Sequence, residues 1–340
     1  MKSVQLVQVG GFLAGTHLQT VQEDVPVPTN NEVLVQVEAS AINPVDWKMA
    51  EYGFLLPSKE PVPVALGCDI AGTVLACPSD ESLVGKRIIS YLGASKMLHA
   101  LDKGAFTEKV LVEKDLIAEI PSDMTFAQGA SLPVGALTAK LLVTEHTAAK
   151  DWLLVWGASS SVGFNVVQIA KKEGYKVIAV ASSNHEKTME ELGADGFVDY
   201  RSDDVEAKVE ALVSGQEGKL NGAVDCIGAP STFGTAAKLV KKLGNHDDAL
   251  VVSTTIAMGL TDVEGVARRP VDLGTANDEP QSRQNVSTWL KEIVDLKPMP
   301  IHSVPGPFSA ETVEKAFQIN KEGVSGKKVV IEWSSSSGQP

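Results

Sequence analysis

Between about residue 125 and residue 253, helical patterns alternate with short segments that are almost continuously apolar. The apolar segments are WLLVWG, YKVIAVAS, GFVDY, GAVDCIG and ALVVSTT. Such an alternation is typical of a parallel sheet that is covered by helices on both faces and connected by right-handed crossovers. This part of the chain is therefore expected to form a doubly wound α/β domain.

About the first 120 residues show a different pattern, in which short β-like runs such as SVQLVQV and KRIISYL are separated by turn residues. This spacing indicates an antiparallel or barrel-like β-domain. A late run, KKVVIEW, is expected to complete a sheet that begins much earlier in the chain. Two further expectations are a helical segment over FAQGASLPVGALTAKLLVTEHT and a loop over VEGVARRPVDLGTANDEPQSRQ.

Length and charge limit the function classes. A chain of 340 residues exceeds the usual size of one core, and its net charge of −13 would repel nucleic acid and anionic membranes. The three cysteines are widely spaced, which favours a reducing compartment, and no run reaches the roughly 18 uninterrupted apolar residues of a membrane span. We expect a cytoplasmic protein that acts on a small molecule.

The segment WGASSSVG lies between an apolar strand and a helical pattern. Strand, glycine turn and helix in that order leave the first N–H groups of the helix available for a pyrophosphate. Gly157 and Gly163 suit the tight turn and close helix packing, and residues 159–161 add hydroxyl groups. The middle glycine of a dinucleotide fingerprint is missing, so an N-cap at Ser160 or Ser161 is an equally consistent interpretation.

The next apolar strand ends in ASSNHEK, without the acidic residue that usually binds the ribose of NAD. Ser182 and Ser183 leave room for a 2′-phosphate, and His185 and Lys187 offer positive charge. The segment therefore favours NADPH. The alternative for Lys187 is an ordinary solvated position on a helix.

Eight motifs in order resemble the medium-chain dehydrogenase/reductase superfamily over nearly the whole chain. They are VEASAINPVDWKM (37–49), GCDIAGTV (67–74), GAFTEKVLV (104–112), ASLPVGALTA (130–139), WGASSSVGFNVVQIAK (156–171), LGADGFVDY (192–200), AVDCIG (223–228) and GKKVVIEW near the end. The sequence is most similar to the zinc-free, quinone-oxidoreductase-like branch and to fungal trans-acting enoyl reductases. The resemblance implies an α/β protein with a GroES-like β-domain (1–124 and 303–340) and a Rossmann NADPH-binding domain with a doubly wound parallel sheet (125–302).

The resemblance also implies that no metal takes part. Positions that hold catalytic zinc in the alcohol-dehydrogenase branch correspond to Asn43, Cys68 and Val134, so one of three ligands remains. Residues 91–106 contain no cysteine, so the structural zinc lobe is missing too. Cys68 is expected to be a small buried residue, with a reactive thiol as the alternative.

Without a metal, hydride transfer depends on placement of the nicotinamide and on hydrogen bonds to the oxygen that gains charge, which suits an enone, an enoyl thioester or a quinone. The expected catalytic residues are Asn43, Lys48 and Tyr52. The expected cofactor-binding residues are Val45, Asp46, Trp47, Lys48, Thr138, Gly157, Ser159, Ser160, Ser161, Val162, Ser182, Ser183, Asn184, His185, Lys187 and Tyr200. Asp46 could equally be a structural turn residue, and the Thr138 hydroxyl could equally bond the preceding helical turn.

Three functions remain open at this point. The first is an NADPH-dependent reductase of free enones or quinones, and the second is a trans-acting enoyl reductase whose substrate is bound to a carrier domain. The third is a non-catalytic NADPH-binding protein. The resemblance is compatible with a monomer or a homodimer.

Overall fold

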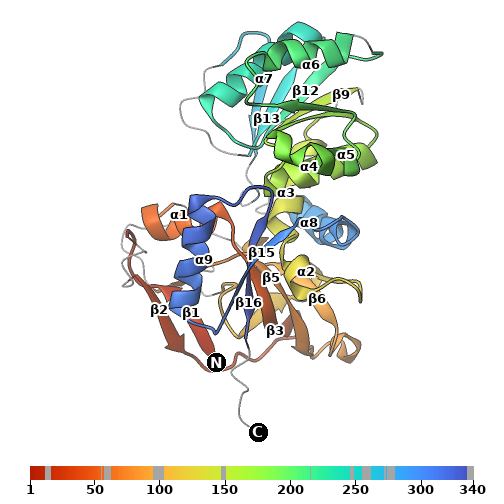
Figure 1. Cartoon of the computed structure of the whole chain (residues 1–340). Helices are drawn as coiled ribbons and strands as arrows, with labels where there is room; N and C mark the ends of the chain where they lie inside the picture. The colour runs from red at the N-terminus through yellow and green to blue at the C-terminus, as the bar shows by residue number, and fades with distance from the viewer. Residues whose placement is uncertain are drawn as a thin grey trace. The chain divides into compact units, whose positions relative to one another are not determined.

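The structure, a computed structural model, forms two compact units. It describes residues 1–11, 17–54, 56, 63–94, 103–146, 151–214, 216–245, 249–254, 262–271, 273 and 280–334. Unit 1 comprises Met1–Val134 and Gly274–Pro340, and unit 2 comprises Gly135–Leu273 (Figure 1). The chain therefore leaves unit 1 once and later returns to it.

Unit 2 contains a six-stranded sheet in which every neighbouring pair is parallel. Its strands are β9 (Trp152–Trp156), β10 (Lys176–Ala181), β11 (Gly196–Asp199), β12 (Leu220–Asp225), β13 (Leu250–Ser253) and β14 (Ala267–Pro270). Their spatial order is β11-β10-β9-β12-β13-β14, which is the 3-2-1-4-5-6 order of the dinucleotide-binding Rossmann fold. The predicted doubly wound sheet is confirmed.

Helices cover both faces of this sheet. They are α4 (Ser161–Lys172), α5 (Glu186–Glu191), α6 (Val205–Ser214) and α7 (Pro230–Leu243), with a short 3₁₀ helix, η5 (Ser183–His185), before α5. Figure 1 shows α6 and α7 on one face and α4 and α5 on the other. Apolar side chains of α6 and α7 form a buried core with β9, β10, β11, β12 and β13, which explains why these strands are apolar throughout.

Unit 1 is built mainly from antiparallel strands. They are β1 (Lys2–Leu6), β2 (Leu18–Gln22), β3 (Glu32–Ala41), β4 (Val64–Ala65), β5 (Asp69–Ala76), β6 (Arg87–Tyr91), β7 (Lys109–Glu113), β8 (Ile117–Glu119), β15 (Ile301–Gly306) and β16 (Lys328–Trp333). One sheet has the order β15-β16-β3-β5-β6-β8, with β7 paired to β3, and a smaller one has the order β2-β1-β4. The late strand β16 pairs antiparallel with β3, as the sequence predicted.

The helices of unit 1 occupy the connections between these strands. They are α1 (Pro44–Tyr52), α2 (Phe126–Ala130), α8 (Pro280–Ile293) and α9 (Ala310–Glu322), with 3₁₀ helices η2 (Glu81–Leu83), η3 (Leu92–Ala94) and η4 (Lys114–Leu116). The expected boundaries, 124/125 and 302/303, assign α2 and α8 to the dinucleotide domain. In the structure both helices belong to unit 1, and the Ser287 hydroxyl on α8 donates to the Asp115 carbonyl at 2.6 Å.

Two expected elements differ from the structure. The helical segment that begins near residue 126 is divided into α2 and α3 (Pro133–Thr144), because Pro133 lacks the N–H needed to continue a helix and is favourable at the start of a new one. This stretch, Phe126–Thr144, is long and apolar enough to cross a membrane, but 72% of it is buried inside the protein. The expected loop over 263–284 contains β14, an exposed edge strand whose short ARRP sequence has no β-like alternation. Its last residues belong to α8, which begins at Pro280, and residues 272 and 274–279 lie outside the described residues.

Candidate functional site

The turn after β9 has the geometry of an anion-binding helix terminus. Gly157 adopts a left-handed φ of 76°, and α4 begins at Ser161. The Ser160 hydroxyl accepts the Gly163 N–H at 3.0 Å, so the capping interpretation is correct for Ser160. The N–H groups of Ser161 and Val162 precede the first intrahelical hydrogen bond, and together with the helix dipole they favour a bound anion.

The two glycines of the turn are favoured for different structural reasons. A Cβ atom on Gly163 would lie 2.3 Å from the Gly157 carbonyl oxygen, and one on Gly157 would lie 2.7 Å from the Ile227 side chain. The Gly163 contact is with backbone and excludes a side chain, whereas the exposed Ile227 side chain could move, so at Gly157 the left-handed φ of 76° is what favours glycine. The strand and helix therefore meet closely enough for the backbone to form the floor of a phosphate site.

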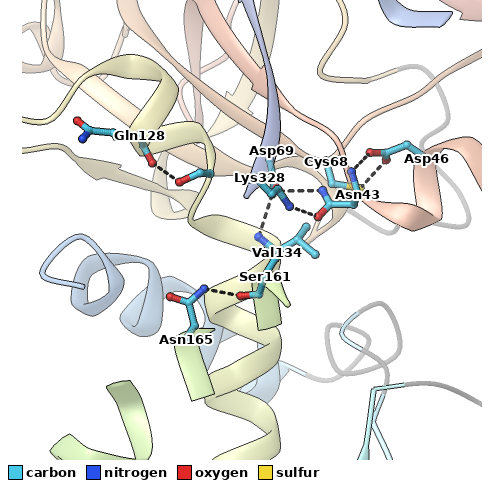
Figure 2. Close-up of polar contacts among 10 residues, drawn as sticks. Asn43, Asp46, Cys68, Asp69, Gln128, Val134, Ser161, Asn165 and Lys328 are labelled. Carbon is cyan, nitrogen blue, oxygen red and sulfur yellow. Dashed lines mark hydrogen bonds and ion pairs between the residues drawn. The ribbon is translucent and has the colours of Figure 1, made fainter. Parts of the chain in front are cut away.

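Two buried polar atoms beside this turn lack partners. Among the described residues, the Ser161 hydroxyl and Asn165 Oδ1 have no hydrogen-bond partner, although Asn165 Nδ2 donates to the Ser161 carbonyl at 2.9 Å (Figure 2). An unsatisfied buried polar atom costs about 1–3 kcal/mol and is uncommon. These orphaned atoms, the glycine floor and the helix terminus together fit the pyrophosphate part of a dinucleotide.

Gly135 allows α3 to lie directly against this region of α4, since a Cβ there would be 2.5 Å from the Ser161 hydroxyl. Thr138 follows one turn later in α3 and is 8% exposed. The sequence analysis identified Thr138 but neither Gly135 nor Asn165. An asparagine within the apolar run FNVVQIA was the available signal, because a buried amide needs partners.

The ends of β10 and β11 bring together the other predicted cofactor residues of unit 2. Ala181 pairs in register with Asp199, and the Tyr200 N–H donates to the Ala181 carbonyl at 3.1 Å. Ser182 is buried, whereas Tyr200 is 49% exposed. Ser183, Asn184 and His185 form η5, Lys187 lies in α5 and Ser159 lies in the turn before α4.

Unit 1 contains a buried polar cluster at the other predicted site. The Asn43 amide is fixed from both ends, because Lys328 Nζ donates to its Oδ1 at 2.5 Å and its Nδ2 donates to Asp69 Oδ2 at 2.8 Å (Figure 2). Asp69 Oδ1 accepts the Val134 N–H at 2.9 Å, and Lys328 Nζ lies 3.7 Å from Asp69 Oδ2. The exposed fraction is 3% or less for the side chains of Lys328 and Asp69.

Asp46 and Cys68 extend this cluster. Asp46 Oδ2 accepts the Asn43 N–H at 2.7 Å, which completes a capping box at the start of α1. The Cys68 thiol lies 3.9 Å from Asp46 Oδ1. Burial raises the pKa of Asp46 to about 7, and burial next to two carboxylates raises the pKa of the Cys68 thiol well above its usual value. Asp46 therefore has the contacts of a structural turn residue, which was the alternative to its predicted role in binding the cofactor.

The remaining predicted residues of unit 1 lie on α1. The Trp47 indole donates to Asn320 Oδ1 on α9 at 3.0 Å, which holds the ring inside unit 1. Lys48 Nζ lies 5.7 Å from the centroid of the Trp47 ring, and Tyr52 packs edge-on against this ring at 6.2 Å. Tyr52 is 66% exposed and Val45 is half-buried. Lys48 and Tyr52 are therefore neighbours of one tryptophan, while their catalytic roles stay predictions.

Comparisons with known proteins follow the same two-part division. The alcohol dehydrogenase GroES-like domain matches residues 29–122, and the zinc-binding dehydrogenase family matches residues 161–246. The trans-enoyl reductase himH of Aspergillus japonicus is 30% identical over 328 residues, which cover 90% of this chain and 90% of that protein. The chain belongs to the medium-chain dehydrogenase/reductase superfamily.

Two further relatives match this chain over a shorter part of its length. The trans-enoyl reductase tazE of Aspergillus terreus is 35% identical over 198 residues, and a chloroplastic quinone-oxidoreductase homolog of spinach (Spinacia oleracea) is 32% identical over 213 residues. These matches cover 54% and 59% of this chain, and they span just under two thirds of each relative, 65% and 62%.

Solved structures of the superfamily confirm the fold. A putative zinc-dependent alcohol dehydrogenase from Rhizobium etli superposes with a TM-score of 0.81 at 23% identity, covering 98% of both chains. The mycobacterial protein Rv1454c, solved in complex with NADPH, superposes with a TM-score of 0.73 at 22% identity and covers 98% of this chain and 99% of its own. The predicted combination of a GroES-like domain with a Rossmann domain is thus confirmed.

The cluster around Asn43 does not fit a zinc ion of the kind found in the alcohol-dehydrogenase branch of this superfamily. The Asn43 amide is already bonded to Lys328 and Asp69, the Lys328 ammonium group lies 3.7 Å from the Asp69 carboxylate, and Val134 contributes only its backbone N–H. Zinc prefers thiolates and neutral imidazoles. Within the part of the chain that the structure describes, no group of three or more His, Cys, Asp or Glu residues is arranged to hold a metal.

Proposed function

We propose that the protein is an NADPH-dependent reductase that acts without zinc on an activated carbon–carbon double bond or a quinone. The main support is the glycine turn of the 3-2-1-4-5-6 sheet, where the buried Ser161 hydroxyl and Asn165 Oδ1 have no partner among the described residues. The end of β10, which lacks an acidic residue, supports the choice of NADPH. The relatives named trans-enoyl reductase and quinone-oxidoreductase homolog support the reaction class.

The preference for NADPH is supported by the end of β10. An NAD site usually has Asp or Glu there, and this strand ends with Ala181 and continues with Ser182 and Ser183. Small side chains leave space for a phosphate group. A protein of the same fold has been solved with NADPH, which is consistent with this choice.

Reduced nicotinamide supplies a hydride when NADPH is bound. The residues of unit 2 bind and orient the dinucleotide through the α4 terminus and the ends of β10 and β11. In unit 1, the fixed Asn43 amide keeps Oδ1 toward Lys328, which leaves Asn43 only an N–H to offer a substrate oxygen. Lys48 is the proposed donor that holds the carbonyl oxygen while it carries the negative charge. Tyr52 is the proposed donor of the proton, which goes to the α-carbon of an enone or enoyl thioester or to the oxygen of a quinone.

Cofactor titrations and a turnover panel test this function. We expect NADPH to bind at least tenfold more tightly than NADH and to be oxidised in the presence of an enone, an enoyl thioester or a quinone. Tighter binding of NADH would refute the cofactor assignment, and stoichiometric zinc after dialysis against a chelator would refute the metal-free mechanism. Tight NADPH binding without turnover of any substrate would instead support a non-catalytic binding protein.

A carrier-bound enoyl thioester is the second candidate substrate. The observation that favours it is the similarity to himH over 90% of both chains, because that relative is named a trans-enoyl reductase. Turnover of a crotonyl thioester on an acyl carrier domain should then exceed turnover of the same acyl group on free pantetheine by at least tenfold. Equal rates on both thioesters would favour the free substrate.

A further inference from the structure

The end of β11 carries an acidic residue that is bonded to its own backbone surroundings. Asp199 accepts the Ser183 N–H at 3.1 Å and the Arg201 N–H at 2.9 Å, and these contacts lower the pKa of its carboxyl group. The Asp199 side chain therefore links the backbone at the start of η5 to the backbone of Arg201, two residues after the end of β11. Its carboxylate fixes the backbone on both sides of this edge of the sheet.

The two residues that follow Asp199 form an exposed aromatic and cationic pair. The Arg201 guanidinium lies 5.3 Å from the centroid of the Tyr200 ring, which is 49% exposed, and the Tyr200 backbone is held by its bond to Ala181. Stacking on an aromatic face restricts the arginine side chain without using its N–H donors.

Arg201 differs from the other arginines whose side chains the structure describes. Arg87 donates to backbone carbonyls, Arg268 pairs with Asp262, and Arg269 pairs with Glu145. Among the described residues, the Arg201 guanidinium makes a ring contact with Tyr200, and its charge contributes to the lowered pKa of the neighbouring Asp199 carboxyl. Its side chain is exposed and stacked on an aromatic ring, so its N–H donors remain accessible to an anionic ligand.

We propose that Arg201, stacked on Tyr200, is the residue that binds the 2′-phosphate of NADPH and sets the preference for NADPH over NADH. A planar guanidinium binds phosphate oxygens in pairs, and a Rossmann site that prefers NADP accommodates the 2′-phosphate close to the end of the second strand. Arg201 meets both requirements, because its neighbours Asp199 and Tyr200 are bonded to Ser183 and Ala181 at the end of β10.

This assignment adds Arg201 to His185 and Lys187, the two residues that the sequence analysis expected to offer positive charge to the phosphate. Lys187 is an exposed residue of α5, and its flexible ammonium group provides a point charge without planar pairing. Arg201 has a fixed stacking partner and a fixed backbone. Its position directly after the predicted Tyr200 makes it the residue that the sequence analysis missed.

The test compares ligands that differ only by the 2′-phosphate, in the variants Arg201→Gln and Lys187→Gln. Calorimetry would measure adenosine 2′,5′-bisphosphate against 5′-AMP, and fluorescence would measure NADPH against NADH. We expect R201Q to weaken the bisphosphate and NADPH ten- to hundredfold while 5′-AMP and NADH change less than twofold. K187Q should change all four affinities less than threefold, and unchanged thermal midpoints would show that both variants fold.

The inference rests on the cofactor part of the proposed function, and the two can fail separately. An R201Q protein that keeps the wild-type ratio of bisphosphate to 5′-AMP affinity would overturn the role of Arg201, as would a selective loss in K187Q. A wild-type protein that prefers NADH would refute both. If R201Q weakened NADPH binding but the wild-type protein turned over no substrate, only the proposed reductase activity would be refuted, because the binding measurements need no substrate.

Discussion

The buried cluster of unit 1 and the glycine turn of unit 2 differ in how completely the protein satisfies their polar groups. In the cluster, Lys328, Asn43 and Asp69 bond to one another and to the Val134 backbone. At the turn, the Ser161 hydroxyl and Asn165 Oδ1 are buried without partners among the described residues. Both regions were predicted as functional from motifs of the same superfamily.

This difference separates a supporting role from a binding role. A polar network whose members are all paired stabilises one arrangement of the backbone, and removing a member leaves its partners unpaired. Unpaired atoms beside a helix terminus instead gain partners when a ligand binds. Lys328 and Asp69 should therefore respond to mutation mainly through stability, and the turn mainly through dinucleotide affinity, while Asn43 keeps one N–H for the proposed substrate contact.

The largest expected effect is the loss of Lys328. The substitution Lys328→Met leaves the buried Asp69 carboxylate without its cation, so the free energy of unfolding should fall by about 3–5 kcal/mol in urea titrations. The adjacent exposed residue provides a matched control, since Lys327→Met should change stability by less than about 0.5 kcal/mol. A loss below about 1 kcal/mol in K328M would contradict the supporting role of the cluster.

A substitution in the turn should change binding as well as stability. In Gly163→Ala the new Cβ would meet the Gly157 carbonyl at 2.3 Å, which should destabilise the protein by about 1–3 kcal/mol and weaken dinucleotide binding at least tenfold. Gly234→Ala is the matched control, because nothing lies within 4 Å of a Cβ at that position in α7. It should stabilise the protein by about 0.4–1 kcal/mol and leave the affinity unchanged.

The parallel sheet and the turn could be predicted because their signals are local. Apolar strands alternating with helices indicated the parallel sheet, and WGASSSVG indicated the tight turn, although its serines left capping and phosphate binding equally open. Ser160 is in fact the cap, while the orphaned Ser161 hydroxyl favours binding. The capping interpretation therefore applies to Ser160, and the phosphate-binding interpretation applies to its neighbour Ser161.

The missed features depend on contacts between distant parts of the sequence. Lys328 meets Asn43 across 285 positions, and no pattern in GKKVVIEW distinguishes Lys328 from its exposed neighbour Lys327. Gly135 was not identified because its significance lies in the approach of α3 to α4. The strand β14 was missed because parallel pairing with β13 stabilises a segment of low β-propensity.

The pH dependence of stability gives a smaller test of the cluster. Burial raises the pKa of Asp46 to about 7, whereas an unfolded aspartate titrates near 3.9. The folded state therefore binds the extra proton between these values, and the stability that this proton contributes is lost as the pH rises toward 7. Relative to Asp46→Asn, wild-type protein should lose about 2 kcal/mol of unfolding free energy between pH 5 and pH 7.

The asparagine variant is a suitable reference because its amide oxygen can still accept the Asn43 N–H of the capping box. Parallel stability curves for wild type and D46N over this range would show that Asp46 titrates normally, and the cluster would then be more open to water than its burial indicates.

The smallest expected effect compares two adjacent serines, one satisfied and one unsatisfied. Ser160→Ala removes the cap of α4 and should cost about 1 kcal/mol of stability. Ser161→Ala removes a buried hydroxyl that has no protein partner, so stability should stay the same or rise slightly, while dinucleotide affinity falls about three- to tenfold. Thermal unfolding and NADPH titration of both variants would measure the contrast. If S161A lost as much stability as S160A and bound NADPH normally, the turn would resemble the self-satisfied cluster of unit 1, and its assignment as the pyrophosphate site would lose its main support.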